Sequence, residues 1–238
     1  DEVTLLGGRL SITGGVRVDY YDLSVDPDAD FLRNNPDPVE GQSAAGVSPK
    51  LGAVYRLDDT YALFGQYAHG FRAPPYDDAN IGFTNNAFGY RVLPNPSLDP
   101  ETSDGIEAGL RGTWRDGSSF QVGGFYTYYR NFIEQVALGA GPTGLLDFQA
   151  RNLDQVVIWG IEGKGRWQFL PEWALLGSIA YARGEDQETG LPIDSVDPLK
   201  GVLGLRYERD DGWGGELVAT AVRRQDRVSD PSFLRTPG

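Results

Sequence analysis

The chain has 238 residues, a net charge of −13, a single histidine and no cysteine or methionine. Without cysteine it can hold neither a disulfide framework nor a cysteine-based zinc site, and its negative charge excludes nucleic acid as an expected partner, because phosphate binding needs a basic face. It also lacks any apolar run long enough for a transmembrane helix.

Alternation of apolar and polar residues with a period of two predicts a chain of β-strands. In the first of them, Leu10 and Val16 fall on one face while Arg17 and Asp19 fall on the other. Most of the predicted strands run eleven residues or more, whereas strands of soluble proteins average about five or six. The nine predicted strands span residues 9–21, 47–57, 60–71, 103–114, 119–134, 153–169, 173–183, 199–209 and 213–224.

The connections between these strands alternate strictly in length. Tight turns are predicted at 58–59, 115–118, 171–172 and 210–212, and long polar loops at 22–46, 72–102, 135–152 and 184–198. Short turns on one rim and long loops on the other are typical of a bacterial outer-membrane barrel, whose strands need about nine to eleven residues to cross the bilayer. The predicted fold is therefore all-β, an antiparallel transmembrane β-barrel with aromatic girdles near both strand ends.

In such a barrel the apolar face of each strand meets lipid and the charged face borders a wet lumen. A soluble sandwich would give the same alternation with the apolar face turned into a dry core. The two folds differ in where they place Leu10, Val16, Leu110 and Leu175. The residues expected on the lumen wall are Arg17, Asp19, Lys50, Arg56, Glu107, Arg111, Glu162, Lys164 and Arg166.

Two short motifs flank the longest predicted loop. Phe71-Arg72-Ala73-Pro74 closes the third strand, and Asn95-Pro96-Ser97-Leu98 precedes the fourth. In this order, at two strand–loop junctions, they resemble the FRAP and NPxL boxes of TonB-dependent outer-membrane receptors, particularly the branch that takes iron from haem, haemoglobin and transferrin. Weaker likenesses at 126–133 and 151–163 extend the resemblance over most of residues 45–208.

The resemblance implies a 22-stranded barrel with an N-terminal plug, and uptake driven by the TonB energy-transducing complex through that plug. We expect residues 1–238 to be part of the barrel domain, with the plug and the final strands absent, because the predicted strand count is odd and no plug precedes it. The implied location is the outer membrane of a Gram-negative bacterium, in contact with its lipid. No enzymatic activity and no intrinsic cofactor are implied.

The loop between the two boxes is the predicted ligand-binding site, since loops of this length are usually functional. Its aromatic, amide and charged side chains suit a flat, partly apolar ligand such as haem. Asp77 and Asp78 make a poor acid–base pair, because adjacent residues of an extended chain point to opposite faces. The candidate residues are Arg72, Tyr76, Asp77, Asp78, Asn80, Phe83, Phe88, Tyr90 and Arg91.

Haem-binding members of this family commonly use a histidine of this loop as an axial iron ligand, but no histidine lies between the boxes here. The resemblance then leaves His69, Tyr76 and Tyr90 as candidate ligands, because phenolate also binds haem iron. His69 is equally explained as a strand-end residue, and the tyrosines as packing residues.

Three other functions stay open at this stage. The same architecture could carry a ferric siderophore, cobalamin or another metal chelate instead of haem or a haem protein. The barrel could be a passive porin, or the chain could be a secreted soluble β-protein, for example a carbohydrate-active enzyme.

Overall fold

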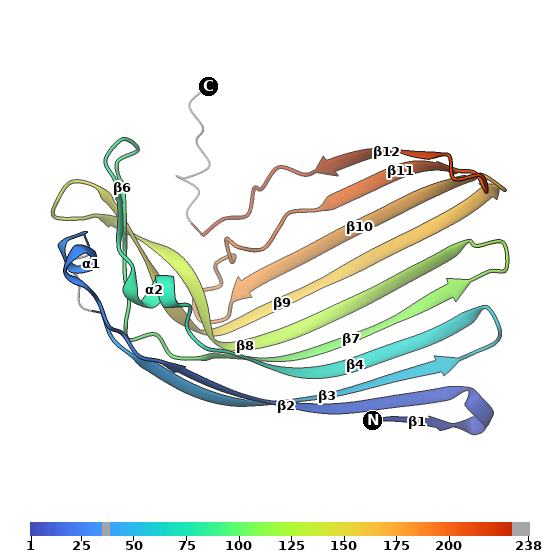
Figure 1. Ribbon diagram of the computed structural model, residues 1–238, viewed down its shortest axis with the longest axis horizontal. Helices are drawn as coiled ribbons and strands as arrows, with labels where there is room; N and C mark the ends of the chain where they lie inside the picture. Colours follow the sequence, from blue (N-terminus) through green and yellow to red (C-terminus); the bar gives the residue numbers. More distant parts are fainter. Residues whose placement is uncertain (35–38, 230–238) are drawn as a thin grey trace.

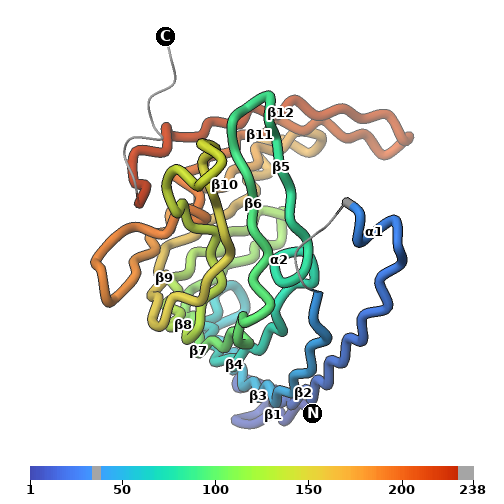
Figure 2. Tube along the Cα trace, turned by 90° about the vertical axis from the view of Figure 1, so that its left-hand side faces the viewer, coloured from blue at the N-terminus to red at the C-terminus, as the bar shows by residue number. Residues whose placement is uncertain are grey.

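The computed structural model describes residues 1–34 and 39–229 (Figure 1). They form one 12-stranded sheet in which ten strands follow one another in chain order, β1-β2-β3-β4-β7-β8-β9-β10-β11-β12. All neighbours along this path are antiparallel. Seen from the loop end in Figure 2, these strands follow an arc, and the remaining pair, β5 and β6, lies on its concave side.

The strands of the arc are β1 (Glu2–Leu5), β2 (Leu10–Leu23), β3 (Gln42–Arg56), β4 (Tyr61–Arg72), β7 (Glu101–Thr113), β8 (Ser119–Ala140), β9 (Leu146–Leu170), β10 (Trp173–Asp186), β11 (Lys200–Glu208) and β12 (Gly214–Val222). The smaller elements are η1 (Leu6–Gly8), α1 (Ala29–Asn34), α2 (Tyr76–Asn80), β5 (Phe83–Asn85) and β6 (Tyr90–Leu93). None of the described helices is long and apolar enough to cross a membrane.

The nine predicted strands are confirmed as β2, β3, β4 and β7 to β12, while the prediction missed β1, β5 and β6. The predicted loop 135–152 is wrong for most of its length. There β8 and β9 continue as a paired ladder, with Val136 opposite Gln149, and only a short turn separates them. The predicted loop 72–102 likewise contains α2 and the β5–β6 hairpin.

Local hydrogen bonds and glycine conformations fix the tight turns, which lie at the end of the sheet opposite the long loops. Asp58 accepts the amide hydrogens of Thr60 and Tyr61 at 2.8 and 2.7 Å, and these bonds hold the pKa of its carboxyl below the usual range. Gly117 and Gly212 adopt φ of 87° and 88°, a conformation that favours glycine. Aspartate and glycine at these positions are therefore what turns the chain into the next strand.

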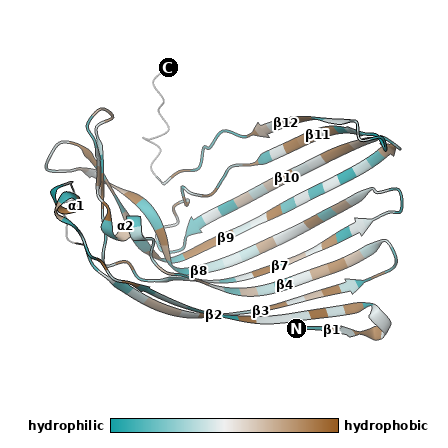
Figure 3. Cartoon of the chain, viewed as in Figure 1, coloured by the Kyte–Doolittle hydropathy of each residue, from teal (hydrophilic) through white to brown (hydrophobic). Residues whose placement is uncertain are grey.

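The cross-strand registers sort the side chains onto two faces, as the alternating hydropathy colours in Figure 3 also suggest. Polar residues of the concave face line two hollows of about 520 and 350 Å³. The opposite face exposes large apolar side chains, and Leu10, Val16, Leu110 and Leu175 are not buried. The residues that border the hollows include Gln66, Glu107, Arg111, Gln121, Glu162, Lys164 and Lys200.

This arrangement confirms the barrel prediction and excludes a sandwich, because the apolar face has no second sheet packed on it in the described part of the chain. Aromatic side chains gather at both ends of the strands. Trp114 packs on Tyr61 at 5.8 Å near the tight turns, and Trp159 packs on Tyr181 at 6.0 Å toward the loops. The two groups match the expected girdles.

Candidate functional site

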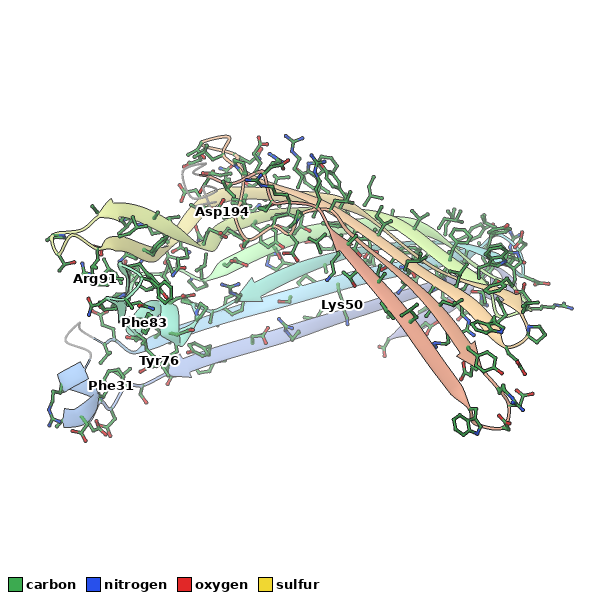
Figure 4. All side chains as sticks on the ribbon, turned by 90° about the horizontal axis from the view of Figure 1, so that it is seen from above. Phe31, Lys50, Tyr76, Phe83, Arg91 and Asp194 are labelled. Carbon is green, nitrogen blue, oxygen red and sulfur yellow. The ribbon has the colours of Figure 1, made fainter. Side chains whose placement is uncertain are left out.

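The segment between the two sequence boxes leaves β4 at Arg72, forms α2 and the β5–β6 hairpin, and returns to the sheet at Glu101. Figure 2 places α2 and this hairpin on the concave side of the arc. In Figure 4, Tyr76, Phe83 and Arg91 lie together at the loop end of the sheet, near Phe31 of α1. We refer to residues 73–100 as the inter-box loop.

The second box anchors the inter-box loop to β9. The Asn95 amide donates to the carbonyl of Ala150 at 2.9 Å, and its Oδ1 accepts from the backbone and hydroxyl of Ser97 at 3.2 and 2.6 Å. Leu98 of the same box is buried against Ile133 and Ala150. The box therefore acts as a fastening of the loop, through one amide and one apolar side chain.

A second asparagine, in β9, joins β8 and the inter-box loop beside this fastening. The Asn152 amide donates to the carbonyls of Asn131 and Asp99 at 2.8 and 3.0 Å, and its Oδ1 accepts from the Asp99 amide at 2.9 Å. Asn131 has φ of 54°, a left-handed conformation that asparagine tolerates better than most residues. Glu101 is buried and accepts the amide hydrogen of Ile133 at 2.9 Å. The sequence pointed to 126–133 and 151–163 through weak family likenesses, but none of these residues was among the predicted site residues.

The hairpin is held by an unusual parallel pairing, in which β6 runs alongside the extended part of β9. At this junction the guanidinium of Arg91 binds both carboxylate oxygens of Asp147, at 3.0 and 2.8 Å. The hydrogen bonds from Arg91 hold the pKa of Asp147 below its ordinary value. Two-point contacts of this kind are among the strongest charge-assisted hydrogen bonds in proteins. Arg91 is thus engaged within the protein, where it orients the hairpin.

Two of the aromatic candidates, Phe83 and Tyr90, form a row that continues from the hairpin onto β9. Phe83 lies 6.1 Å from Tyr90, and Tyr90 lies edge-on to Phe148 of β9 at 6.2 Å. Phe83 is 53% exposed, and Phe88, at the tip of the hairpin, is 81% exposed. An exposed pair of phenylalanines on a rigidly fastened hairpin is a surface prepared for an apolar partner.

The candidate ligand-binding residues of α2 differ in their contacts and exposure. Asn80 is 1% exposed, and its Oδ1 accepts the amide hydrogen of Glu40 at 2.7 Å. It therefore ties the inter-box loop to the loop after β2 and is closed to a ligand. Burial, together with the neighbouring Asp77 carboxylate, raises the pKa of Asp78, and Arg72 opposes this shift. Asp77 and Arg72 are exposed.

Tyr76, the first residue of α2, is 36% exposed. It lines a hollow of about 280 Å³ together with Phe31, Asp26 and Asp28 from the loop after β2. None of the residues that line this hollow belongs to the aromatic row of the hairpin. Tyr76 and Tyr90 therefore belong to two different surfaces.

His69 lies elsewhere. The β4–β7 register pairs it with Asp104, on the same face as Tyr67 and Ile106, which is the apolar outer face of the sheet. Its Nδ1 is 3.0 Å from Asp104 Oδ1, and the same carboxylate accepts from Tyr67 at 2.7 Å and from Arg130 at 3.0 Å. Among the residues that the structure describes, no group of three or more His, Asp or Glu is placed to hold a metal ion.

Comparisons with known proteins agree with this geometry. A model of the family described as "TonB dependent receptor-like, beta-barrel" matches residues 1–238. The chain is 28% identical over 98% of its length to the haemoglobin-haptoglobin utilization protein B of Neisseria meningitidis serogroup C, and 31% identical over 96% to the hemin receptor of Yersinia enterocolitica.

These matches cover 33% and 35% of the two relatives, so the chain spans about a third of their length. Among solved structures, the copper transporter OprC superposes with a TM-score of 0.70 over 95% of this chain and 34% of its own, at 19% identity, which supports the fold alone. TonB-dependent receptor barrels are outer-membrane proteins of Gram-negative bacteria, and the family consists of transport receptors. The chain belongs to the TonB-dependent receptor family, as part of its outer-membrane β-barrel.

Proposed function

We propose that this chain is part of an outer-membrane receptor for the active uptake of haem, either free or from a haem-carrying protein. The names of the two relatives, a hemin receptor and a haemoglobin-haptoglobin utilization protein, support this assignment. The energy comes from the TonB complex, which we expect to act through a plug domain outside residues 1–238. The polar concave wall then borders the route by which the ligand passes.

The observation that carries the proposal is the aromatic row at the loop end of the concave side, together with Phe88 at the tip of the same hairpin. Phe83 and Phe88 present exposed rings, and the parallel pairing with β9 fixes the strand that follows them. A porphyrin is flat and largely apolar, so stacking on such rings removes apolar surface from water at about 25 cal/mol per Å². Because the hairpin is already fastened, little ordering cost opposes that gain.

For the axial ligand we propose Tyr90. Its ring is part of the aromatic row, between Phe83 and Phe148, and a phenolate binds haem iron. His69 is a weaker candidate, because Asp104 engages its Nδ1 on the apolar outer face. Tyr76 faces the separate hollow beside α1. Of the remaining candidates, Arg91 and Asn80 position the loop, while Arg72, Asp77 and Asp78 supply charge around it.

The test is a haem titration of the whole receptor that carries this chain, purified in detergent, followed at the Soret band. Phe88→Ala and Phe83→Ala should each weaken binding by about tenfold, the effect of roughly 1.4 kcal/mol of lost apolar contact. Tyr90→Phe keeps the packing and should change the Soret position, because only ligation is lost.

Trp213→Ala is the matched control, since Trp213 is 75% exposed but lies at the turn before β12, at the opposite end of the sheet. Equal haem affinity in all of these variants would reject the hairpin as the site. Binding of a ferric siderophore or cobalamin with no Soret response to haem would reject haem as the ligand and favour the metal-chelate alternative.

A further inference from the structure

Residues 187–199, which connect β10 to β11, are packed against the sheet at its loop end. We call them the β10–β11 loop. Ile193 of this loop is 3% exposed and packs against Phe132 of β8 and Val156 of β9. Figure 4 shows Asp194 of the same loop at the end of the sheet where the β5–β6 hairpin lies. The β10–β11 loop is therefore docked on the two longest strands of the sheet.

One carboxylate of β8 fixes this loop. Glu134 accepts the backbone N–H of Ser195 at 3.2 Å through Oε1, and it accepts the Ser195 hydroxyl at 2.7 Å through Oε2. Burial raises the pKa of Glu134, and the carboxylates of Asp194 and Glu101 add to this shift, while the hydrogen bonds from Ser195 oppose it. Glutamine has the same shape and no charge, so it should be able to replace Glu134 in this contact.

The neighbouring residue in β8, Ile133, holds the inter-box loop instead. Its amide donates to Glu101, the first residue of β7, at 2.9 Å. Its side chain is buried together with Leu98 of the inter-box loop and Ala150 of β9. The Asn131 carbonyl, two residues earlier, accepts from the asparagine of β9 that also binds Asp99. The inter-box loop thus docks on the same stretch of β8 as the β10–β11 loop.

This stretch, residues 131–134, lies between the two loops, and we call it the joint. Phe132 and Ile133 are only 9% and 7% exposed, so two successive residues of one strand are both buried. Successive side chains of a strand point to opposite sides, and here Phe132 packs against the β10–β11 loop while Ile133 packs against the inter-box loop. Because buried side chains are close-packed and transmit displacement, the joint cannot shift without disturbing both loops.

We propose that Glu134 is a positioning residue for the inter-box loop, and that the two loops open together because the joint links them. When Glu134 holds Ser195, the β10–β11 loop covers Phe132 and keeps the joint in the place that Leu98 requires. Energetic coupling of this kind is reciprocal, so loosening either loop loosens the other by the same factor. The coupling depends on contacts within the chain and is independent of the transported ligand.

Hydrogen exchange of the whole receptor in detergent, without ligand, tests the coupling. Glu134→Ala removes two hydrogen bonds to Ser195, so amides of residues 193–196 should exchange about thirtyfold faster. Amides of residues 95–101, on the other side of the joint, should exchange at least about fivefold faster, the lower end of typical coupling. Thr189→Ala is the control, because Thr189 bonds within the turn of its own loop, and it should leave 95–101 at the native rate.

Two further variants examine the joint from both sides. Glu134→Gln should keep both segments near their native exchange rates, because the amide can still bond to Ser195. Leu98→Ala removes packing on Ile133 from the other side, and it should speed up exchange of residues 193–196 by at least about fivefold.

Exchange of residues 95–101 at the native rate in Glu134→Ala, with 193–196 accelerated, would overturn the proposal. Equal acceleration in Glu134→Gln and Glu134→Ala would overturn it as well. If Glu134→Ala yields no folded barrel, Ser195→Ala answers the same question with an exposed residue. Losing one hydrogen bond should speed up 193–196 about fivefold and 95–101 about twofold, and an unchanged rate at 95–101 would again refute the coupling.

Discussion

Replacement of Asn152 by alanine should release the inter-box loop while leaving the barrel wall intact. The Asn152 amide group makes three hydrogen bonds, to the Asn131 carbonyl and to both backbone groups of Asp99. Two of these bonds, those to Asp99, hold the loop, so at about 1 kcal/mol net for each hydrogen bond the variant loses about 2 kcal/mol of loop docking. A tenfold change in an equilibrium constant corresponds to about 1.4 kcal/mol, so the undocked population should rise about thirtyfold.

Hydrogen exchange of the whole receptor measures this opening directly. In the Asn152→Ala variant, amides of residues 95–101 should exchange about thirtyfold faster, while amides of β10 and β11 should exchange at the native rate. Asn85→Ala is the matched control, because the Asn85 side chain bonds, among the described residues, only to the amide of Phe88 in its own turn. If residues 95–101 exchange at the native rate in the Asn152 variant, the fastening does not hold the loop and the reasoning is refuted.

Three further predictions concern charge, packing and the two faces. Because Arg91 lowers the pKa of Asp147, the hairpin should stay docked as the pH falls through the ordinary aspartate range near 4 and should detach only below it. A spin label attached at Phe88→Cys reports the detachment. Detachment above pH 5 would contradict this prediction. Gly160→Ala should lower the free energy of unfolding in urea by about 1–3 kcal/mol, because a methyl group there overlaps the Tyr181 carbonyl and the Phe125 ring. Gly124→Ala is the control, since the nearest atom to a methyl group there is 3.6 Å away. Equal losses at both glycines would refute this. Leu203→Arg on the lipid face should lower the folding free energy of the barrel by about 2–4 kcal/mol, and Val202→Arg on the lumen face should lower it far less. The yield of folded barrel measures this, and the opposite order would reverse the assignment of the faces.

The sequence predicted the barrel wall well because alternation is a local signal. Strands such as β2 and β10 carry their own apolar and polar faces, so their pairing partners were not needed to recognise them. The extension of β8 and β9 escaped prediction for the opposite reason. The last residues of β8, 137–140, are mostly small, and it is the ladder between the two strands, with Ala137 opposite Phe148, that makes them extended.

The inter-box loop was located correctly as a segment, but its internal structure depends on contacts distant in sequence. The parallel pairing of β6 with β9 and the Arg91–Asp147 ion pair join residues more than fifty positions apart, and no local pattern announces either. The buried state of Asn80 has the same origin, since its partner Glu40 belongs to another loop. The outward direction of His69, by contrast, could have been obtained by continuing the alternation of β4 from Leu63.

The most direct test of the central claim is uptake of labelled haem by cells in which the receptor carrying this chain is the only route across the outer membrane. We predict accumulation that requires TonB and that falls when both Phe83 and Phe88 are replaced by alanine, with unchanged amounts of receptor in the membrane. Accumulation that persists without TonB, or TonB-driven uptake of a ferric siderophore with none of haem, would contradict the account.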